Sequence, residues 1–438
     1  MAREELLSAP AIHKFRTLLA LGLANFVDQA EAVALPTLFP AIMAAWGLTE
    51  LHLGTIASVR NFLQTAGGPF WGYAADRFSR KQVLILGAGL WGMWTLACGL
   101  AGNYTQLLVL RALSGLGLAC LLPGAFALIA DHFQPQERGR ALGTLGFLGV
   151  FGVVGGVLTM GWVVEAPGLG WRWGFILLGL ASVASGGLMA LFVDEPPRGA
   201  AEPELAALIT YEDAQRFSIR PAHVARLLRI PTMWAIFLQG IPGSIPWVVM
   251  GAMMMTWMIT VRGVSYGQGT VIMAGLVVGA ALSHILGGYL GDRLARWSPR
   301  YGRILLAQIS VLGGIPLTIL IFTHPLAFTP FFVLAFATAL VIGWAGPGAK
   351  EPIMGEVVVP ELRASAYSLD GVVEGGLAAS GAFIAGFLAQ RYGLTRAMLL
   401  TVPLPWGLCL LAWCLFYWTY PADAMRLRAE MARRREEL

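Results

Sequence analysis

The chain has 438 residues, of which 57% are hydrophobic and 13% are charged, and its formal net charge is +5. Soluble globular proteins carry about 25% charged residues, so this composition excludes an ordinary soluble domain and indicates an integral membrane protein. The positive charge does not indicate a nucleic-acid-binding protein, because Lys and Arg recur between apolar runs instead of gathering in one patch. We therefore expect membrane lipids around the chain and no nucleic-acid partner.

Twelve apolar runs are long enough to cross a bilayer, which takes about 20 helical residues. They lie at 17–46, 51–75, 82–101, 105–131, 140–166, 172–193, 230–261, 265–291, 301–323, 328–357, 364–390 and 394–420. Their continuous apolar character favours helices over the alternating strands of a barrel. Outside the runs or within three residues of their ends, 23 Lys and Arg residues lie on the side of the N-terminus and 4 lie on the other. The positive-inside rule therefore predicts an inner or plasma membrane protein with both termini in the cytoplasm.

The two halves of the sequence repeat one another. "GYAADRFSRK" at 72–81 returns as "GYLGDRLARW" at 288–297, and a Pro-Gly-Ala at Pro123 returns at Pro347. We predict a six-helix bundle at 1–193, a linker at 194–229 with a surface helix around 211–219, a second bundle at 230–420 and a tail at 421–438. Each half has an even number of spans, so the halves are predicted to be parallel repeats, as in many secondary transporters.

Two motifs carry a resemblance to a known family. Gly72-x-x-x-Asp76-Arg77-x-x-Arg80-Lys81 resembles the loop 2–3 signature of the major facilitator superfamily, and Arg111-x-x-x-Gly115-x-Gly117 resembles its span-4 motif. The resemblance implies an all-α membrane fold of twelve helices in two six-helix repeats, and secondary transport by alternating access. It also implies a conformational latch at the cytoplasmic helix ends, formed by Gly72, Asp76, Arg77, Arg80, Lys81 and, in the second repeat, Asp292 and Arg293.

Within that superfamily, residues 20–205 look most like the Spinster branch, through Asn25-x-x-Asp28 and "EPPRGAAE" among other stretches. That likeness implies a lysolipid or sphingoid phosphate as substrate. Gln29 replaces an arginine of the Spinster pattern, and Leu118 replaces an acid. A carrier of small organic anions, or a multidrug exporter, therefore remains the alternative.

An integral membrane enzyme is a remote alternative, because the six His residues are scattered without metal-ligand spacing and no phosphate-binding loop occurs. We expect no cofactor, no metal and no catalytic residues. The expected partners are a small-molecule or lipid-like substrate and protons, and the expected state is a monomer.

Charged residues inside the spans are the main candidates for substrate or proton handling, because a charge at mid-membrane is costly and usually faces a cavity or a partner. They are Asp28, Glu31, Arg111, Lys350, Glu351, Asp370 and Glu374. Asp28 and Glu31 share one helical face, which is predicted to meet Arg111. Such a group could carry a proton, or it could be a fixed ion pair that only locks two helices.

Lys350 follows Pro347-Gly348, where a proline breaks the helix. The lysine could bind an anionic group of a substrate, or form a salt bridge to Asp370 or Glu374, and both alternatives stay open. Five further residues are predicted to line the cavity wall: Gln29, Arg60, Gln64, Trp247 and Trp344. Arg60 could instead extend toward the membrane surface.

Overall fold

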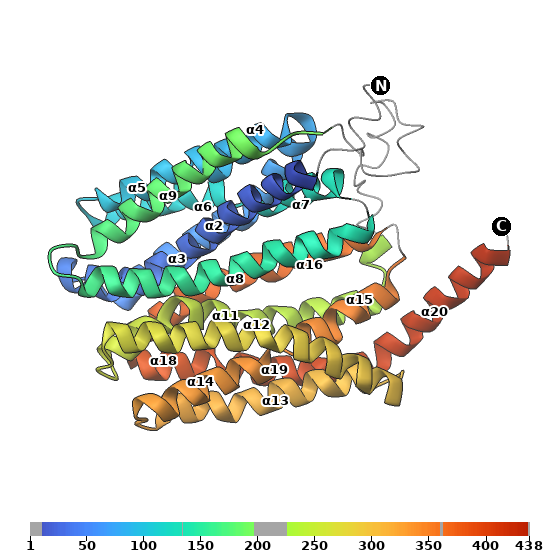
Figure 1. Ribbon diagram of the computed structural model, residues 1–438. Coiled ribbons are helices and arrows are strands. Elements are labelled where there is room, and N and C mark those ends of the chain that lie inside the picture. The colour runs from blue at the N-terminus through green and yellow to red at the C-terminus, as the bar shows by residue number, and fades with distance from the viewer. Residues whose placement is uncertain (1–10, 134, 197–225, 360–361, 437–438) are drawn as a thin grey trace, which may run out of the picture. The chain divides into compact units, whose positions relative to one another are not determined.

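The computed structural model describes residues 11–133, 135–196, 226–359 and 362–436, and these ranges contain helices but no strand. The predicted surface helix at 211–219 lies outside them, as does the side chain of Asp76. The chain forms two compact units: unit 1 is Met1–Leu48 with Val59–Ser218, and unit 2 is Thr49–Ser58 with Ile219–Leu438. The prediction of an all-α membrane fold is confirmed, and Figure 1 labels the helices.

Unit 1 is built from six predicted spans, and the first is the long helix α2. Its helices are α2 (Ala11–Trp46), α3 (Glu50–Arg77), α4 (Arg80–Leu84), η1 (Ile85–Leu90), α5 (Gly92–Gly99), α6 (Tyr104–Leu118), α7 (Leu121–His132), α8 (Pro135–Glu165) and α9 (Trp171–Phe192). Helix α2 packs along α8 and α9, and α5 packs along α9. The first turns of α3 group with unit 2, where the Phe383 N–H donates to the Ser58 hydroxyl at 2.9 Å.

Glycines on α8 allow its close approach to α2. A Cβ built on Gly156 would lie 2.6 Å from the Cα of Ala30, and one on Gly152 would meet the backbone of Phe26. Small residues let membrane helices approach in this way. The glycine-rich run of the fifth span is therefore a packing surface that holds α2, the helix of Asp28 and Glu31, in place.

Replacing Gly156 by alanine should lower the thermal midpoint of the detergent-solubilised protein. The added methyl group meets backbone, which cannot move aside without separating the helices, and overpacking of this kind costs about 1–3 kcal/mol. Gly146→Ala is the matched control in the same helix, because its Cβ would meet nothing within 4 Å. The control should leave the midpoint unchanged or raise it slightly, and equal effects of the two substitutions would contradict this packing account.

Unit 2 contains the other six predicted spans, several of them broken. Its helices are α11 (Pro231–Thr260), α12 (Tyr266–Trp297), α13 (Gly302–Thr323), α14 (Phe328–Ile342), η3 (Gly346–Lys350), α15 (Glu351–Val357), α16 (Arg363–Ala378), α17 (Ser380–Tyr392), α18 (Leu394–Thr401), α19 (Pro403–Ala412), η5 (Trp413–Leu415) and α20 (Phe416–Glu436). Helix α20 runs through the boundary predicted at residue 420, with Pro421 inside it.

The described residues include ten helical segments that are long and apolar enough to cross a membrane. The predicted spans missing from these ten are the second and the fourth. The second is the helix α3, whose composition includes Arg60 and Pro69. The fourth is divided at Ala119–Cys120 into α6 and α7, each too short to count as one segment.

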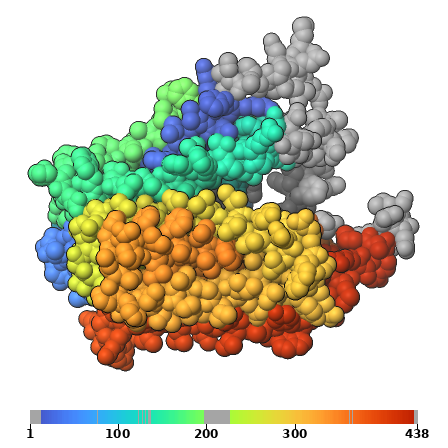
Figure 2. Space-filling model, turned by 60° about the horizontal axis from the view of Figure 1, so that its bottom comes forward, coloured from blue at the N-terminus to red at the C-terminus, as the bar shows by residue number. Residues whose placement is uncertain are grey.

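The outward surface of α13 and α14 is apolar, as expected of a surface that meets lipid. Leu312 and Val333 are more than half exposed, and Ile319, Leu320 and Phe328 are also exposed. This part of unit 2 is coloured orange in Figure 2. Because exposed backbone cannot be satisfied by lipid, helices with apolar outer faces are the form in which such a chain can cross the bilayer.

Candidate functional site

A buried group of charges lies in unit 1, and we call it the unit 1 cluster: Asp28, Glu31, Arg60 and Arg111. Glu31 on α2 and Arg111 on α6 form an ion pair with 3.4 Å between Oε1 and Nη1, and both side chains are almost fully buried. The hydroxyl of Thr95 on α5 donates to the same Glu31 oxygen. The Arg111 guanidinium also lies 5.6 Å from the ring centroid of Phe175. Glu31 is therefore held by a cation and a hydroxyl.

Asp28 is held much more loosely than Glu31. Its Oδ2 receives one long hydrogen bond of 3.4 Å from the Gln29 amide, and its buried Oδ1 has no hydrogen-bond partner among the described residues. Its charge is close enough to those of Glu31 and Arg60 for Coulomb interaction. A buried carboxylate oxygen without a donor is costly while ionised, so the structure stabilises the carboxylate of Asp28 less well than that of Glu31.

Arg60 does not extend toward the membrane surface, which corrects one of the two interpretations of this residue. Its side chain is only 7% exposed, and Gly115 on α6 allows it in, because a Cβ there would lie 2.8 Å from the Arg60 Cγ. Nη1 donates to Asn61 at 3.1 Å, whereas Nε and Nη2 have no partner in the described part of the chain. Arg60 is thus a buried cation with unused donors next to the acids of α2.

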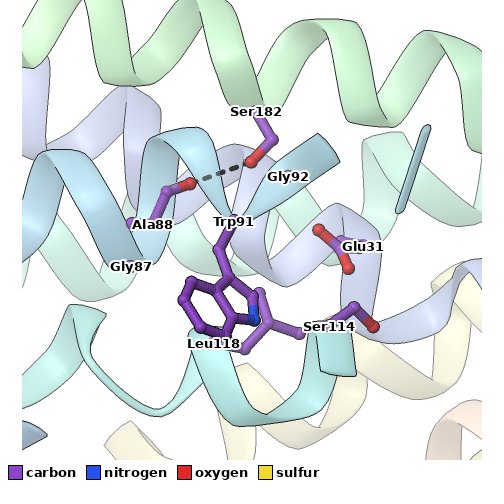
Figure 3. Close-up of a pocket in the computed structure, with 8 residues that line it drawn as sticks. All are labelled: Glu31, Gly87, Ala88, Trp91, Gly92, Ser114, Leu118 and Ser182. Carbon is purple, nitrogen blue, oxygen red and sulfur yellow. Dashed lines mark hydrogen bonds between the residues drawn. The ribbon is translucent and has the colours of Figure 1, made fainter. Parts of the chain in front are cut away.

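Figure 3 shows a crevice that Glu31 lines together with residues of η1, α5, α6 and α9. Gly87 and Gly92 keep its walls close, and the Ser182 hydroxyl donates to the Ala88 carbonyl at 2.8 Å. Leu118 forms part of the wall, at the position where the Spinster pattern has an acid. The crevice is too narrow for a water molecule, so Glu31 is sealed from solvent on this side.

A second buried group of charges lies in unit 2, and we call it the unit 2 cluster: Lys350, Asp370 and Glu374. Lys350 Nζ lies 2.5 Å from Glu374 Oε2 and 2.9 Å from Asp370 Oδ2. The two acids are one turn apart on α16, and Lys350 is the last residue of the π-helix η3, which begins at Gly346 beside Pro347. Lys350 was predicted either to bind a substrate anion or to form a salt bridge to Asp370 or Glu374, and in the structure it forms salt bridges to both acids. The Ser244 hydroxyl of α11 donates to Glu374 Oε1.

The remaining predicted substrate and cavity residues lie apart from these clusters or beside them. Glu351 has an exposed side chain, and its backbone carbonyl accepts a hydrogen bond from the Tyr367 hydroxyl. The carboxylate of Glu351 therefore does not belong to the unit 2 cluster. Trp247 packs edge-on against Trp406 in unit 2, with 6.1 Å between ring centroids. Trp344 has a buried indole N–H without a partner in the described ranges. Gln29 contacts Asp28, and Gln64 is half-buried on α3.

The predicted latch residues lie at helix ends, and two of them make ion pairs. Arg80 pairs with Asp131, and its backbone N–H donates to Glu195 at 2.6 Å. In unit 2, Asp292 pairs with Arg303 at 3.2 Å, and Arg303 also lies 3.4 Å from Glu356. Gly72 and Arg77 lie on α3, Lys81 on α4 and Arg293 on α12, and the side chains of Arg77 and Arg293 are exposed. Asp76 falls outside the described side chains, so the latch remains a prediction.

The sequence analysis did not identify Asp131, Glu195, Arg303 and Glu356 as partners of the latch residues. One signal could have identified two of them. Asp131 and Glu356 are 225 residues apart. The same offset relates Arg138 to Arg363, each of which ends a Pro-x-x-Arg sequence in its half of the chain. Thr95 and Ser244 were also missed, because a hydroxyl residue in an apolar run gives no sign of its partner.

Comparison with known proteins places these observations in a family. The sequence pattern of the Major Facilitator Superfamily matches residues 21–349. A probable sulfoacetate transporter of Cupriavidus necator is 28% identical over 318 residues, covering 69% of this chain and 70% of that protein. A cis,cis-muconate transport protein of Acinetobacter baylyi is 27% identical over 278 residues, covering 63% of this chain and 65% of that protein.

A solved structure extends the comparison to the fold. A bacterial homologue of the human lysosomal transporter Spinster, in an inward-facing and unoccupied conformation, has a TM-score of 0.82. It covers 94% of this chain and 98% of that chain at 20% identity, which shows likeness of fold alone. Because the family pattern matches well over half of its residues, the chain belongs to the Major Facilitator Superfamily, and it is a multi-pass membrane transporter of small molecules, not an enzyme.

Proposed function

We propose that this chain is a proton-coupled secondary transporter that moves a small organic anion by alternating access. The observation that carries the proposal is Arg60, a buried cation with two nitrogens that have no hydrogen-bond partner among the described residues. A planar guanidinium with unused donors suits a carboxylate or sulfonate, which can accept two parallel hydrogen bonds. An inner or plasma membrane location, cytoplasmic termini and a monomeric state belong to the same proposal.

The charges of the unit 1 cluster link the proton to the anion. With every group ionised, the two acids and two arginines sum to zero. Protonating Asp28 leaves one net positive charge in a buried place, and an anion beside Arg60 would neutralise it. Proton and anion therefore stabilise each other's binding, and this reciprocity is what coupled transport requires.

The substrates named for two relatives support this substrate class. Sulfoacetate and cis,cis-muconate are both organic anions at neutral pH, and each of those proteins matches most of this chain. A lysolipid or sphingoid phosphate is the second candidate. It is favoured by the Spinster-like residues of the N-terminal half and by the likeness of fold, and a phosphate is also an anion that Arg60 could bind.

Transport by purified protein in liposomes tests the proposal. With an inward proton gradient, we expect uptake from a panel of labelled organic anions that includes sulfoacetate, cis,cis-muconate and aromatic carboxylates. Arg60→Gln should reduce that uptake at least about tenfold, because one charge-assisted contact contributes about 1.5–3 kcal/mol. Arg300→Gln, in the exposed loop before α13, is the matched control and should transport normally.

Two results would count against the proposal. If no organic anion of the panel moves and a lysolipid does, the second candidate is the better one. If Arg60→Gln transports as fast as the unaltered protein, Arg60 does not hold the anion.

A further inference from the structure

The unit 2 cluster repeats the chemical arrangement of the unit 1 cluster. In each, a glutamate is held by a cation and a hydroxyl: Glu31 by Arg111 and Thr95, and Glu374 by Lys350 and Ser244. In each, a neighbouring aspartate keeps one buried oxygen, Oδ1, that has no hydrogen-bond partner in the described part of the chain. Asp370 therefore corresponds to Asp28 in its unpartnered Oδ1, although its Oδ2 also lies 2.9 Å from Lys350 Nζ.

The charges of the unit 2 cluster do not balance. One ammonium faces two carboxylates, so the cluster carries one net negative charge when all three groups are ionised. Asp370 is only 5% exposed. An unbalanced charge buried at this depth is costly, and a carboxylate in that position gains by taking up a proton.

Among the residues that the structure describes, the elements packed against α16 supply no further cation to the cluster. Helix α11 has no Asp, Glu, Lys, Arg or His in its sequence. On α15, Glu351 is exposed, and Glu356 pairs with Arg303 and accepts a hydrogen bond from the Tyr420 hydroxyl. Arg391 lies in the last turn of α17, and Arg363 in the first turn of α16 donates to the Val358 carbonyl. Tyr367 and Cys409 are the other titratable groups nearby, and neither is a cation.

We propose that the unit 2 cluster is a second proton-binding site of the carrier, with Asp370 as the group that takes the proton. The inference rests on the proposed proton-coupled function. On loading, an O–H bond forms at Oδ1 of Asp370 while Lys350 stays an ammonium paired with Glu374, and the cluster becomes neutral. On release, that O–H bond breaks and the proton passes to water. Together with Asp28, the carrier then moves two protons for each substrate molecule.

The proton stoichiometry can be measured by a null-flux experiment in proteoliposomes. With the membrane potential held at zero by potassium and valinomycin, opposing proton and cis,cis-muconate gradients are varied until net flux stops. For a pH difference of one unit, two coupled protons balance about a hundredfold substrate gradient, and one proton balances about tenfold. We expect about a hundredfold for the unaltered chain and about tenfold for Asp370→Asn, with Asp370→Glu restoring the higher value.

Two comparisons make the outcome decisive. Glu165→Gln, an exposed acid at the end of α8, should keep the unaltered null point. If Asp370→Asn does not insert correctly, Glu374→Gln is the second test. It also leaves one carboxylate paired with the Lys350 ammonium, so it should lower the null-point substrate gradient to about tenfold as well. The inference is overturned if folded variants keep the null point of the unaltered chain. If the unaltered chain shows no dependence on pH at all, it is the proposed function that fails.

Discussion

Replacing Asp28 by asparagine is expected to reduce proton-driven accumulation of substrate by at least about tenfold per unit of pH gradient, while substrate exchange without a gradient continues. Asparagine resembles a permanently protonated aspartate in shape and charge, so the anion can still bind beside Arg60. It cannot give up or take a proton, so substrate binding no longer depends on pH through this residue. Counterflow and null-flux measurements on the same proteoliposome preparation separate these two properties.

The effect of a second substitution depends on the number of proton sites. If Asp370 is the second one, Asp28→Asn retains the coupling of a single proton, and the double variant Asp28→Asn, Asp370→Asn retains none. Asp28→Glu restores a titratable group on the same helical face and should recover part of the accumulation. Full accumulation by folded Asp28→Asn would show that the coupling carboxylate lies elsewhere.

The helical spans could be predicted because a bilayer constrains composition over whole segments. Their interruptions were harder to predict. Pro347 signals the π-helix η3, but the break at Ala119–Cys120 follows no proline and falls inside the single apolar run predicted at 105–131. At this break the path of the helix depends on tertiary contacts of glycines, since a Cβ on Gly117 would collide with the Trp91 ring. Contacts of this kind join distant residues and leave no local pattern.

The candidate site could be predicted only in part, for the same reason. Spacing alone placed Asp28 with Glu31 and Asp370 with Glu374, because residues three or four apart share a helical face. Spacing could not show which acid of each pair accepts a hydrogen bond from a distant hydroxyl. That depends on Thr95, 64 residues from Glu31, and on Ser244, 130 residues from Glu374. The hydroxyl contact of each glutamate and the unpartnered Oδ1 of each aspartate became visible only once the helices were packed.

Replacing Arg111 by methionine should be the most destabilising single change in the unit 1 cluster. Arg111 has no exposed surface and Glu31 is 2% exposed, so the substitution leaves a buried carboxylate without its cation. Breaking a buried pair from one side costs about 3–5 kcal/mol, which is a large part of the stability of most proteins. Thermal unfolding in detergent should show a much lower midpoint for Arg111→Met, and transport should be lost.

The double variant Arg111→Met, Glu31→Met distinguishes a buried charge from lost packing. It removes both charges and keeps apolar volume, so it should recover most of the thermal midpoint, because well-packed apolar pairs often replace buried ion pairs without loss. Arg77→Met, at an exposed position on α3, is the control and should leave the midpoint nearly unchanged. If the double variant unfolds as early as Arg111→Met alone, the instability comes from the packing of the guanidinium against Phe175 and α5, and Glu31 does not require a cation.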